Sequence, residues 1–216
     1  MEHQEEMTWW LTRPEALDDV RRSLIGHYST LRLVQDSETI EVRGTFPVLH
    51  GDDILDTYEV VVRFPSTYPD DPPDVLETGG RIPRSADRHN SEAACLFVPF
   101  EWRIRRPDLS FATFLHDAMR GYFIGQSLAE LNAPWPYGER EHGVDGMLQA
   151  LADLLGITDL NAASLAMQML NKPTIKGHWD CFCGSSKRLR HCHGERLREL
   201  HKVGTAQSAR RSLQRD

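Results

Sequence analysis

The sequence has 216 residues, of which 40% are hydrophobic and 26% are charged, and its formal net charge is −7. This length allows one domain of ordinary size and a small appendage. No apolar run is long enough to cross a bilayer, and the N-terminal "MEHQEEMTWW" is acidic where a signal peptide is basic and then apolar. We therefore expect a cytoplasmic protein that has no membrane partner.

The charge is unevenly distributed along the chain. Residues 176–216 contain ten Lys or Arg against four Asp or Glu, which gives +6 and leaves −13 for the other 175 residues (−7 minus 6). An acidic main body repels phosphate. Nucleic acid is therefore disfavoured as a partner, except through the basic C-terminal tail.

The stretch "TRPEALDDVRRSLIGHYSTL" (12–31) predicts an N-terminal helix. Thr12 and Glu15 have the spacing of a capping box, and Pro14 lies in the first turn. Apolar residues recur at helical spacing at Leu17, Val20, Leu24, Tyr28 and Leu31.

Two strand-like stretches follow this helix. "TIEVRGTFPV" (39–48) alternates apolar and polar residues, and "DTYEVVVRFP" (56–65) is rich in β-branched and aromatic residues, so both are predicted strands of an antiparallel meander. The next loop contains three prolines, which fix φ and remove hydrogen-bond donors. We expect this loop to lie outside the sheet and to lead into a short strand at Asp74–Leu76.

A second helix is predicted over "DLSFATFLHDAMRGYF" (108–123), downstream of a loop that contains Cys95. One helical face would carry Phe111, Phe114, Leu115, Ala118, Met119, Tyr122 and Phe123. The predicted fold class is therefore α+β, in the order helix, antiparallel strands, proline-rich loop, cysteine loop and helix.

Four markers in this order resemble those of ubiquitin-conjugating enzymes. They are Tyr68–Pro73 for the Y-P-x-x-P-P signature, His89-Asn90 for H-P-N, Cys95-Leu96 for the catalytic Cys-Leu, and Trp102 with Pro107 for W-x-P. The resemblance covers roughly Thr8 to Gly143. It implies a four-stranded antiparallel meander with helices on one side and an open groove at the cysteine.

The chain also departs from the pattern of the eukaryotic enzymes. The proline of H-P-N is missing, Asn90 is only five positions before Cys95, and "NAPWPYGEREHG" (132–143) stands where later helices are found. In this the chain is more similar to the bacterial relatives of CBASS antiphage operons, which accompany a cGAS-like nucleotidyltransferase. The resemblance implies that this nucleotidyltransferase is the protein substrate. Since the sequence has no Gly-rich nucleotide loop, activation would require a separate activating enzyme or a substrate that is already activated.

The chemistry of Cys95 can also be argued from the residues. A thiol of ordinary pKa, about 8.5, is nucleophilic enough to accept an acyl group in trans-thioesterification. When an amine then attacks the thioester, the resulting oxyanion needs a hydrogen-bond donor, for which Asn90 is the nearby candidate. The short gap leaves His89 open as a donor or general base, and His142 is a further candidate. In the alternative interpretation, Cys95 is a small buried hydrophobe in a non-catalytic adaptor.

"CFCGSSKRLRHCHG" (181–194) has the spacing of a zinc knuckle. Cys181 and Cys183 are separated from Cys192 and His193 by eight residues, so the two pairs can close one tetrahedral site. Three thiolates and a neutral imidazole give bound zinc a net charge of −1, which three basic residues of the loop would offset: Lys187, Arg188 and Arg190.

This stretch resembles the SEC-C motif at the C-terminal end of a bacterial preprotein translocase ATPase. The resemblance implies that Cys192 and His193 are the last two ligands and that His191 is a surface residue. Because the protein fills all four ligand positions, we expect the zinc to be structural.

The predicted organisation has four parts. They are a ubiquitin-conjugating-enzyme-like domain (1–143), a helical connector (144–175), a SEC-C zinc module (176–203) and a disordered basic tail (204–216). The Met and Leu stripe of the connector indicates core packing or a partner-binding face. The predicted function is thioester formation at Cys95 and transfer to an acceptor in antiphage defence. The alternative is a scaffold whose zinc module binds a partner protein.

Overall fold

The computed structural model describes residues 8–36, 39–83, 89–90, 92–105, 108–136, 141 and 143–204. The chain forms two compact units. The first unit comprises 1–96 and 108–137, and the second comprises 97–107 and 138–216.

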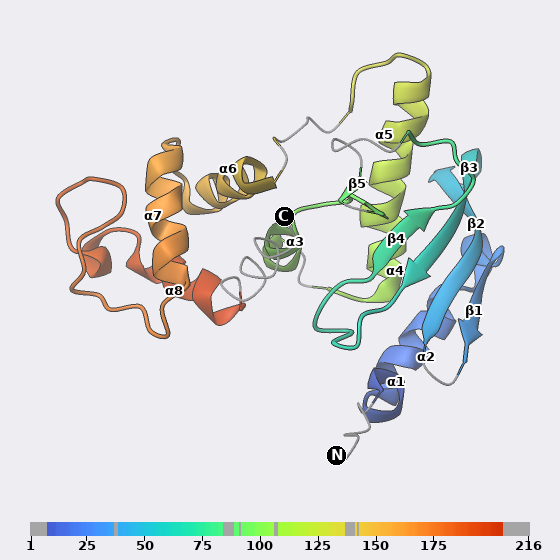
Figure 1. Cartoon of the computed structure of the whole chain (residues 1–216), viewed down its shortest axis with the longest axis horizontal. Coiled ribbons are helices and arrows are strands. Elements are labelled where there is room, and N and C mark those ends of the chain that lie inside the picture. Colours follow the sequence, from blue (N-terminus) through green and yellow to red (C-terminus); the bar gives the residue numbers. More distant parts are fainter. Residues whose placement is uncertain are drawn as a thin grey trace. The chain divides into compact units, whose positions relative to one another are not determined.

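The first unit is built on a four-stranded antiparallel sheet in the order β1-β2-β3-β4, which is a meander (Figure 1). The prediction of an α+β fold with an antiparallel meander is therefore confirmed. In chain order, the described elements of this unit are α1 (Trp9–Thr12), α2 (Pro14–Ser23), η1 (Gly26–Tyr28), β1 (Leu31–Gln35), β2 (Ile40–His50), β3 (Asp53–Arg63), β4 (Asp74–Glu77), β5 (His89–Asn90), β6 (Ala93–Ala94), α4 (Phe111–Thr113), the π-helical η2 (Phe114–Met119) and α5 (Arg120–Glu130).

One face of the sheet is covered by the continuous helix α4–η2–α5. Phe123 of this helix lies 5.3 Å from Phe46 of β2 and 4.6 Å from Tyr58 of β3, measured between ring centroids. Phe46 and Tyr58 are register partners in the sheet, so their side chains project from the same face. All seven apolar residues that were predicted to share one helical face are buried, which confirms that prediction.

The N-terminal helix is shorter than its apolar spacing predicts. It ends at Ser23, and Tyr28 lies in η1, while Leu31 begins β1 and pairs with Gly44 of β2. Gly26 has φ +74°, a left-handed conformation that interrupts a right-handed helix. The prediction of one helix through Leu31 is therefore wrong, because strand pairing accounts for the burial of this leucine.

The predicted capping box is also wrong. Thr12 is the last residue of α1, and its hydroxyl donates to the Trp9 carbonyl at 3.2 Å. Arg13 is the N-cap of α2 and makes no side-chain capping bond, while Pro14 occupies the first turn as expected. The short helix α1 thus uses the threonine that the sequence pattern assigned to α2.

Hydrogen bonds and ion pairs of Arg81 connect the loop after β4 to β3 and to α5. The Arg81 guanidinium pairs with both carboxylate oxygens of Asp56 at 2.9 and 2.8 Å and with Glu130 at 2.7 Å. It also donates to the Thr57 carbonyl at 2.6 Å and lies 4.1 Å from the centroid of the Tyr58 ring. Hydrogen bonds and attraction from Arg81 hold the pKa of Asp56 well below its usual value.

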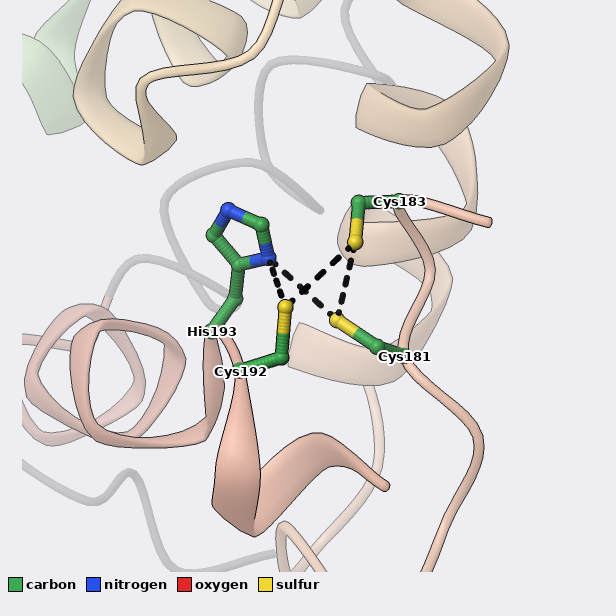
Figure 2. Close-up of side chains that lie close together, drawn as sticks. All are labelled: Cys181, Cys183, Cys192 and His193. Atoms are coloured by element: carbon green, nitrogen blue, oxygen red, sulfur yellow. Dashed lines mark hydrogen bonds between the residues drawn. The ribbon is translucent and has the colours of Figure 1, made fainter. Parts of the chain in front are cut away.

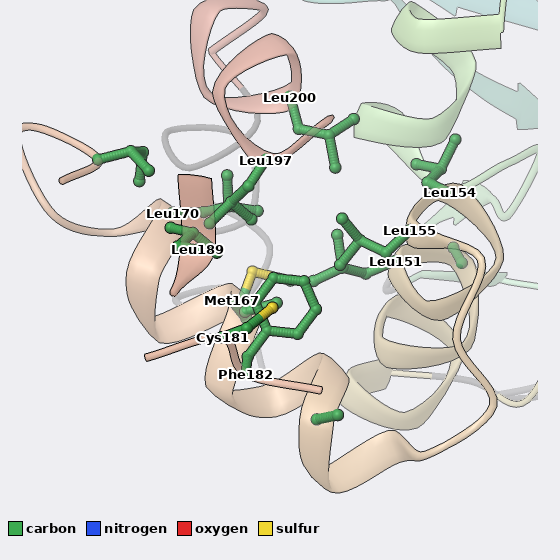
Figure 3. Close-up of a cluster of buried hydrophobic side chains, with 14 of the residues drawn as sticks. Leu151, Leu154, Leu155, Met167, Leu170, Cys181, Phe182, Leu189, Leu197 and Leu200 are labelled. Atoms are coloured by element: carbon green, nitrogen blue, oxygen red, sulfur yellow. The ribbon is translucent and has the colours of Figure 1, made fainter. Parts of the chain in front are cut away.

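The second unit has its own hydrophobic core (Figure 3). Its described elements are α3 (Pro99–Arg105), α6 (Gly143–Leu155), α7 (Leu160–Leu170), η3 (Leu189–His191) and α8 (Gly194–Lys202). The core joins side chains from α6, α7 and α8 to Cys181, Phe182 and Leu189 of the knuckle. The segment 144–175, predicted as a connector, therefore shares one core with the zinc motif.

Most of the apolar residues predicted in α6 and α7 contribute to this core. Leu151, Leu154, Leu155 and Leu170 are buried, whereas Leu165 is exposed. Among the described residues, no single helix has both the length and the apolar character of a membrane span; only α6 and α7 taken together pass that test, and they are bent by 88°.

Candidate metal centre and cysteine turn

The second unit brings four metal-ligand side chains together at one point (Figure 2). The potential ligand atoms of Cys181, Cys183, Cys192 and His193 all lie within 4.8 Å of one another. The Cys183 sulfur is 3.4 Å from that of Cys181 and 3.5 Å from that of Cys192. The Nδ1 atom of His193 is 3.3 Å from the Cys181 sulfur and 3.2 Å from the Cys192 sulfur.

These spacings fit a single tetrahedral ion. Metal–ligand bonds of about 2.3 Å to sulfur and about 2.0 Å to nitrogen give tetrahedron edges of about 3.5–3.8 Å. The four measured separations of 3.2–3.5 Å need only a small expansion to reach those values. Three thiols and one imidazole form a donor set consistent with zinc, so the tetrad could hold a zinc ion.

Backbone pairing inside the knuckle positions the two halves of the tetrad. The Cys181 amide donates to the Lys187 carbonyl at 2.9 Å, and the Leu189 amide donates to the Trp179 carbonyl at 2.7 Å. Asp180 and Arg188 form an isolated antiparallel bridge and an ion pair of 2.7 Å. Arg188, which was expected to offset the charge of the metal site, thus forms an ion pair at the base of the loop.

A tight backbone approach orients His193. It is the N-cap of α8, and the next residue, Gly194, lies so close to Leu189 that an added Cβ would be 2.5 Å from the Leu189 carbonyl oxygen. The ring of Phe182 lies 5.0 Å from the ring of His193 between centroids. His191 is exposed and lies outside the tetrad, and its Nε2 accepts a hydrogen bond from Arg190 at 3.0 Å.

The thiols of the tetrad differ in acidity. Desolvation raises the pKa of the buried Cys181 to about 11. Desolvation acts in the same direction on Cys183, but hydrogen bonds from Ser185 and from the neighbouring thiols outweigh it and lower the pKa of Cys183 to about 6. A thiolate at Cys183 is the form that binds a metal cation.

Ser185 also belongs to this site and was not among the residues predicted for it. Its hydroxyl lies 3.5 Å from the Cys192 sulfur, in addition to its bonds to Cys183. It therefore acts as an outer hydrogen-bonding group of the tetrad. The position of Ser185 two residues after Cys183, in a turn whose Gly184 has φ +73°, is a signal that could have indicated this role.

Cys95 lies apart from the tetrad in the chain and belongs to the first unit. It directly follows β6, a short strand that pairs with β5 and packs beside β4. The Leu96 amide donates to the Ala94 carbonyl at 3.0 Å, so Cys95 is the central residue of a three-residue turn. Ala94 is buried and Leu96 is half-buried, while Cys95 is exposed.

The Cys95 thiol is accessible but not acidic. Partial desolvation by the surrounding protein raises its pKa above the usual value, although the residue retains exposed surface. Cys95 is therefore not a buried, inert cysteine.

The other residues that were predicted near Cys95 are placed only in part. His89 and Asn90 form β5, where His89 is the register partner of Ala94 and Asn90 that of Ala93. Their backbones thus lie beside the strand that leads into Cys95, while their side chains are outside the description. His142 also lies outside the described residues.

Trp102, the tryptophan of the W-x-P marker, lies outside the first unit. It lies in α3, which belongs to the second unit, and stacks on Phe97 with ring centroids 4.9 Å apart. The region 8–143 is therefore interrupted by residues 97–107, which belong to the other compact unit.

No family model, curated protein or solved structure matches this chain.

Proposed function

We propose that this chain is a cysteine-dependent acyl carrier of the ubiquitin-conjugating type. The observation that carries the proposal is the separation of its cysteines into two classes. Three of them share one tetrad, whereas Cys95 is exposed at a tight turn after a sheet-packed strand. The markers around it, from Tyr68 to Trp102, support an acyl-transfer role over that of a structural cysteine.

The proposed reaction has two balanced steps. The Cys95 thiolate attacks the carbonyl carbon of a donor thioester, and the donor thiolate leaves. An acceptor amine then attacks the Cys95 thioester, an amide bond forms, Cys95 leaves as a thiolate, and the amine proton passes to solvent. Both steps pass through an oxyanion, for which we propose the side chain of Asn90, with His89 as the alternative donor. The pairing of β5 with β6 supports this assignment, because the backbone of His89 and Asn90 lies beside the strand that leads into Cys95.

The raised pKa of Cys95 suits a carrier. A thiol of higher pKa gives a more nucleophilic thiolate but is also the poorer leaving group. The resulting thioester would therefore persist until an acceptor amine is bound in position. The same property makes the resting thiol slow to react with adventitious electrophiles.

The proposed acyl donor is the C-terminal carboxylate of a cGAS-like nucleotidyltransferase, activated by a separate enzyme and handed to this chain in CBASS antiphage defence. The support for this partner is the sequence resemblance to the bacterial relatives. For the tetrad we propose zinc in a structural role, because four protein ligands leave no open position for substrate.

Coexpression with a cGAS-like nucleotidyltransferase and its activating enzyme tests the proposal. Wild-type protein should give a higher-mass band that disappears on reduction, and Cys95→Ala should give none. Cys95→Ser should give a reduction-resistant oxyester or no band, since serine is the poorer nucleophile. Asn90→Ala should form the thioester and transfer from it about two to three orders of magnitude more slowly. A reducible adduct of normal yield in Cys95→Ala would refute the nucleophile.

A second candidate is a scaffold in which the knuckle binds a partner protein. It is favoured by exposed basic residues on the knuckle loop, including Lys187 and Arg190. In that case the double substitution Lys187→Glu with Arg190→Glu should abolish copurification of the partner. Intact copurification, together with loss of all adduct in Cys95→Ala, would favour the acyl carrier.

A further inference from the structure

The lysines of this chain occupy one compact unit. Residues 1–171 contain no lysine, and the four lysines are Lys172, Lys176, Lys187 and Lys202. Arginine is not restricted in this way, since both parts of the chain contain it. All four lysines belong to the second unit, and all four are exposed.

Arginine supplies the cation in most of the described ion pairs of both units. The pairs described here use Arg13, Arg21, Arg22, Arg43, Arg63, Arg81, Arg105, Arg188 and Arg196. Within the described part of the chain, no lysine ammonium takes part in an ion pair or a side-chain hydrogen bond. The four amines therefore have no structural partner among these residues, and the lysines do not serve as substitutes for arginine.

The two side chains differ in their reactivity toward a thioester. At pH 7.4 about one lysine amine in a thousand is neutral, while for a guanidinium the neutral fraction is below about one in a hundred thousand. Only the neutral amine attacks the carbonyl carbon. A unit that contains arginine but no lysine thus has cationic side chains for its ion pairs and no side-chain amine that could remove an acyl group from its own cysteine.

We propose that the four lysines of the second unit are the chain's own acyl acceptors, and that the lysine-free first unit preserves the thioester at Cys95. This inference rests on the proposed function. In the step, a lysine amine attacks the thioester carbonyl carbon, an amide forms, the Cys95 thiolate leaves, and the ammonium proton of the intermediate passes to solvent. The acceptor lies in the same chain or in a second copy.

Lys187 is the acceptor with the most direct structural consequence. Its side chain is exposed on the knuckle loop, and its carbonyl accepts the hydrogen bond from the Cys181 amide at 2.9 Å. Acylation there removes one positive charge from the loop that joins the two pairs of the tetrad.

The test uses the full-length, zinc-loaded chain and a peptide thioester of mercaptoethanesulfonate, which loads Cys95 without any partner enzyme. Adducts are followed on gels with and without reductant and located by mass spectrometry of peptides. The wild type should show a reducible Cys95 adduct that is replaced by reduction-resistant adducts on the four lysines. Replacing all four lysines by arginine should prolong the thioester and lower the resistant adduct at least about tenfold.

A matched pair of variants tests the lysine-free unit itself. Glu92 is exposed and lies three residues before Cys95. In the background without lysine, Glu92→Lys should restore a reduction-resistant adduct at position 92, and Glu92→Arg should not.

The outcomes separate the two proposals. If Cys95 forms a thioester but no lysine adducts appear, this inference is wrong and the carrier function still stands. The same conclusion holds if the resistant adduct is on the N-terminal amine and persists at full yield in the four-arginine variant. Lysine adducts that form equally in Cys95→Ala overturn the inference, because the reagent then acts directly. Failure of Cys95 to form any thioester overturns the proposed function and the inference with it.

Discussion

Removing one metal ligand should loosen α6 and α7 as well as the knuckle. Apparent zinc-binding free energies of knuckle-sized sites are about 10–16 kcal/mol, so each of four ligands contributes about 2.5–4 kcal/mol, or two to three decades in zinc affinity. Cys192 is exposed, and Cys192→Ser removes only this contribution. Cys181 is 7% exposed within the shared core, so Cys181→Ser also places a hydroxyl among apolar side chains, at a further cost of about 1–3 kcal/mol.

Both variants should lose zinc by elemental analysis, and Cys181→Ser should be the less stable of the two toward urea. Hydrogen exchange should become faster in α6 and α7, because Leu151, Leu155 and Leu170 pack in the same core as the knuckle. Exchange in β2 and β3 of the first unit serves as the internal control. Unchanged exchange of α6 and α7 in zinc-free protein would contradict the shared-core argument, and equal stability of the two variants would contradict the burial argument.

Three further predictions concern the first unit. Arg81→Met should lower the free energy of unfolding by about 1–2 kcal/mol in urea titrations, because Asp56 and Glu130 lose their shared partner while staying partly solvated. The matched control Arg13→Met breaks an ion pair at the surface and should leave the urea midpoint unchanged. Because the folded-state pKa of Asp56 is depressed, its stabilisation is present above about pH 4 and is lost as the pH falls further, so Asp56→Asn should flatten the acid limb of the stability curve. Iodoacetamide should modify Cys95 with a pH midpoint above the value of about 8.5 expected for the same loop as a free peptide, and a midpoint below it would refute the raised pKa.

The sequence alone determined the features whose parts are close together in the chain. Cys181, Cys183, Cys192 and His193 span thirteen residues, so their spacing restricts them to a small loop that can close around one ion. The helix that begins at Phe111 was predictable for a similar reason, because its apolar period is local and all seven predicted positions are buried. The alternation in 39–48 likewise identified β2 without knowledge of its partners.

The tertiary structure decided which surfaces meet. The spacing of apolar residues indicates which of them are buried but not what they pack against. Leu31 fits a helical pattern, whereas its burial comes from the pairing of β1 with β2. The apolar faces of α6 and α7 were visible in the sequence, yet only the structure placed Cys181 and Phe182 against them and so joined the connector to the knuckle. The exposure of Cys95 was likewise decided by the tertiary structure. It depends on the hydrogen bond between Leu96 and Ala94 and on the packing of β6 beside β4, two strands that are nearly twenty residues apart in the chain.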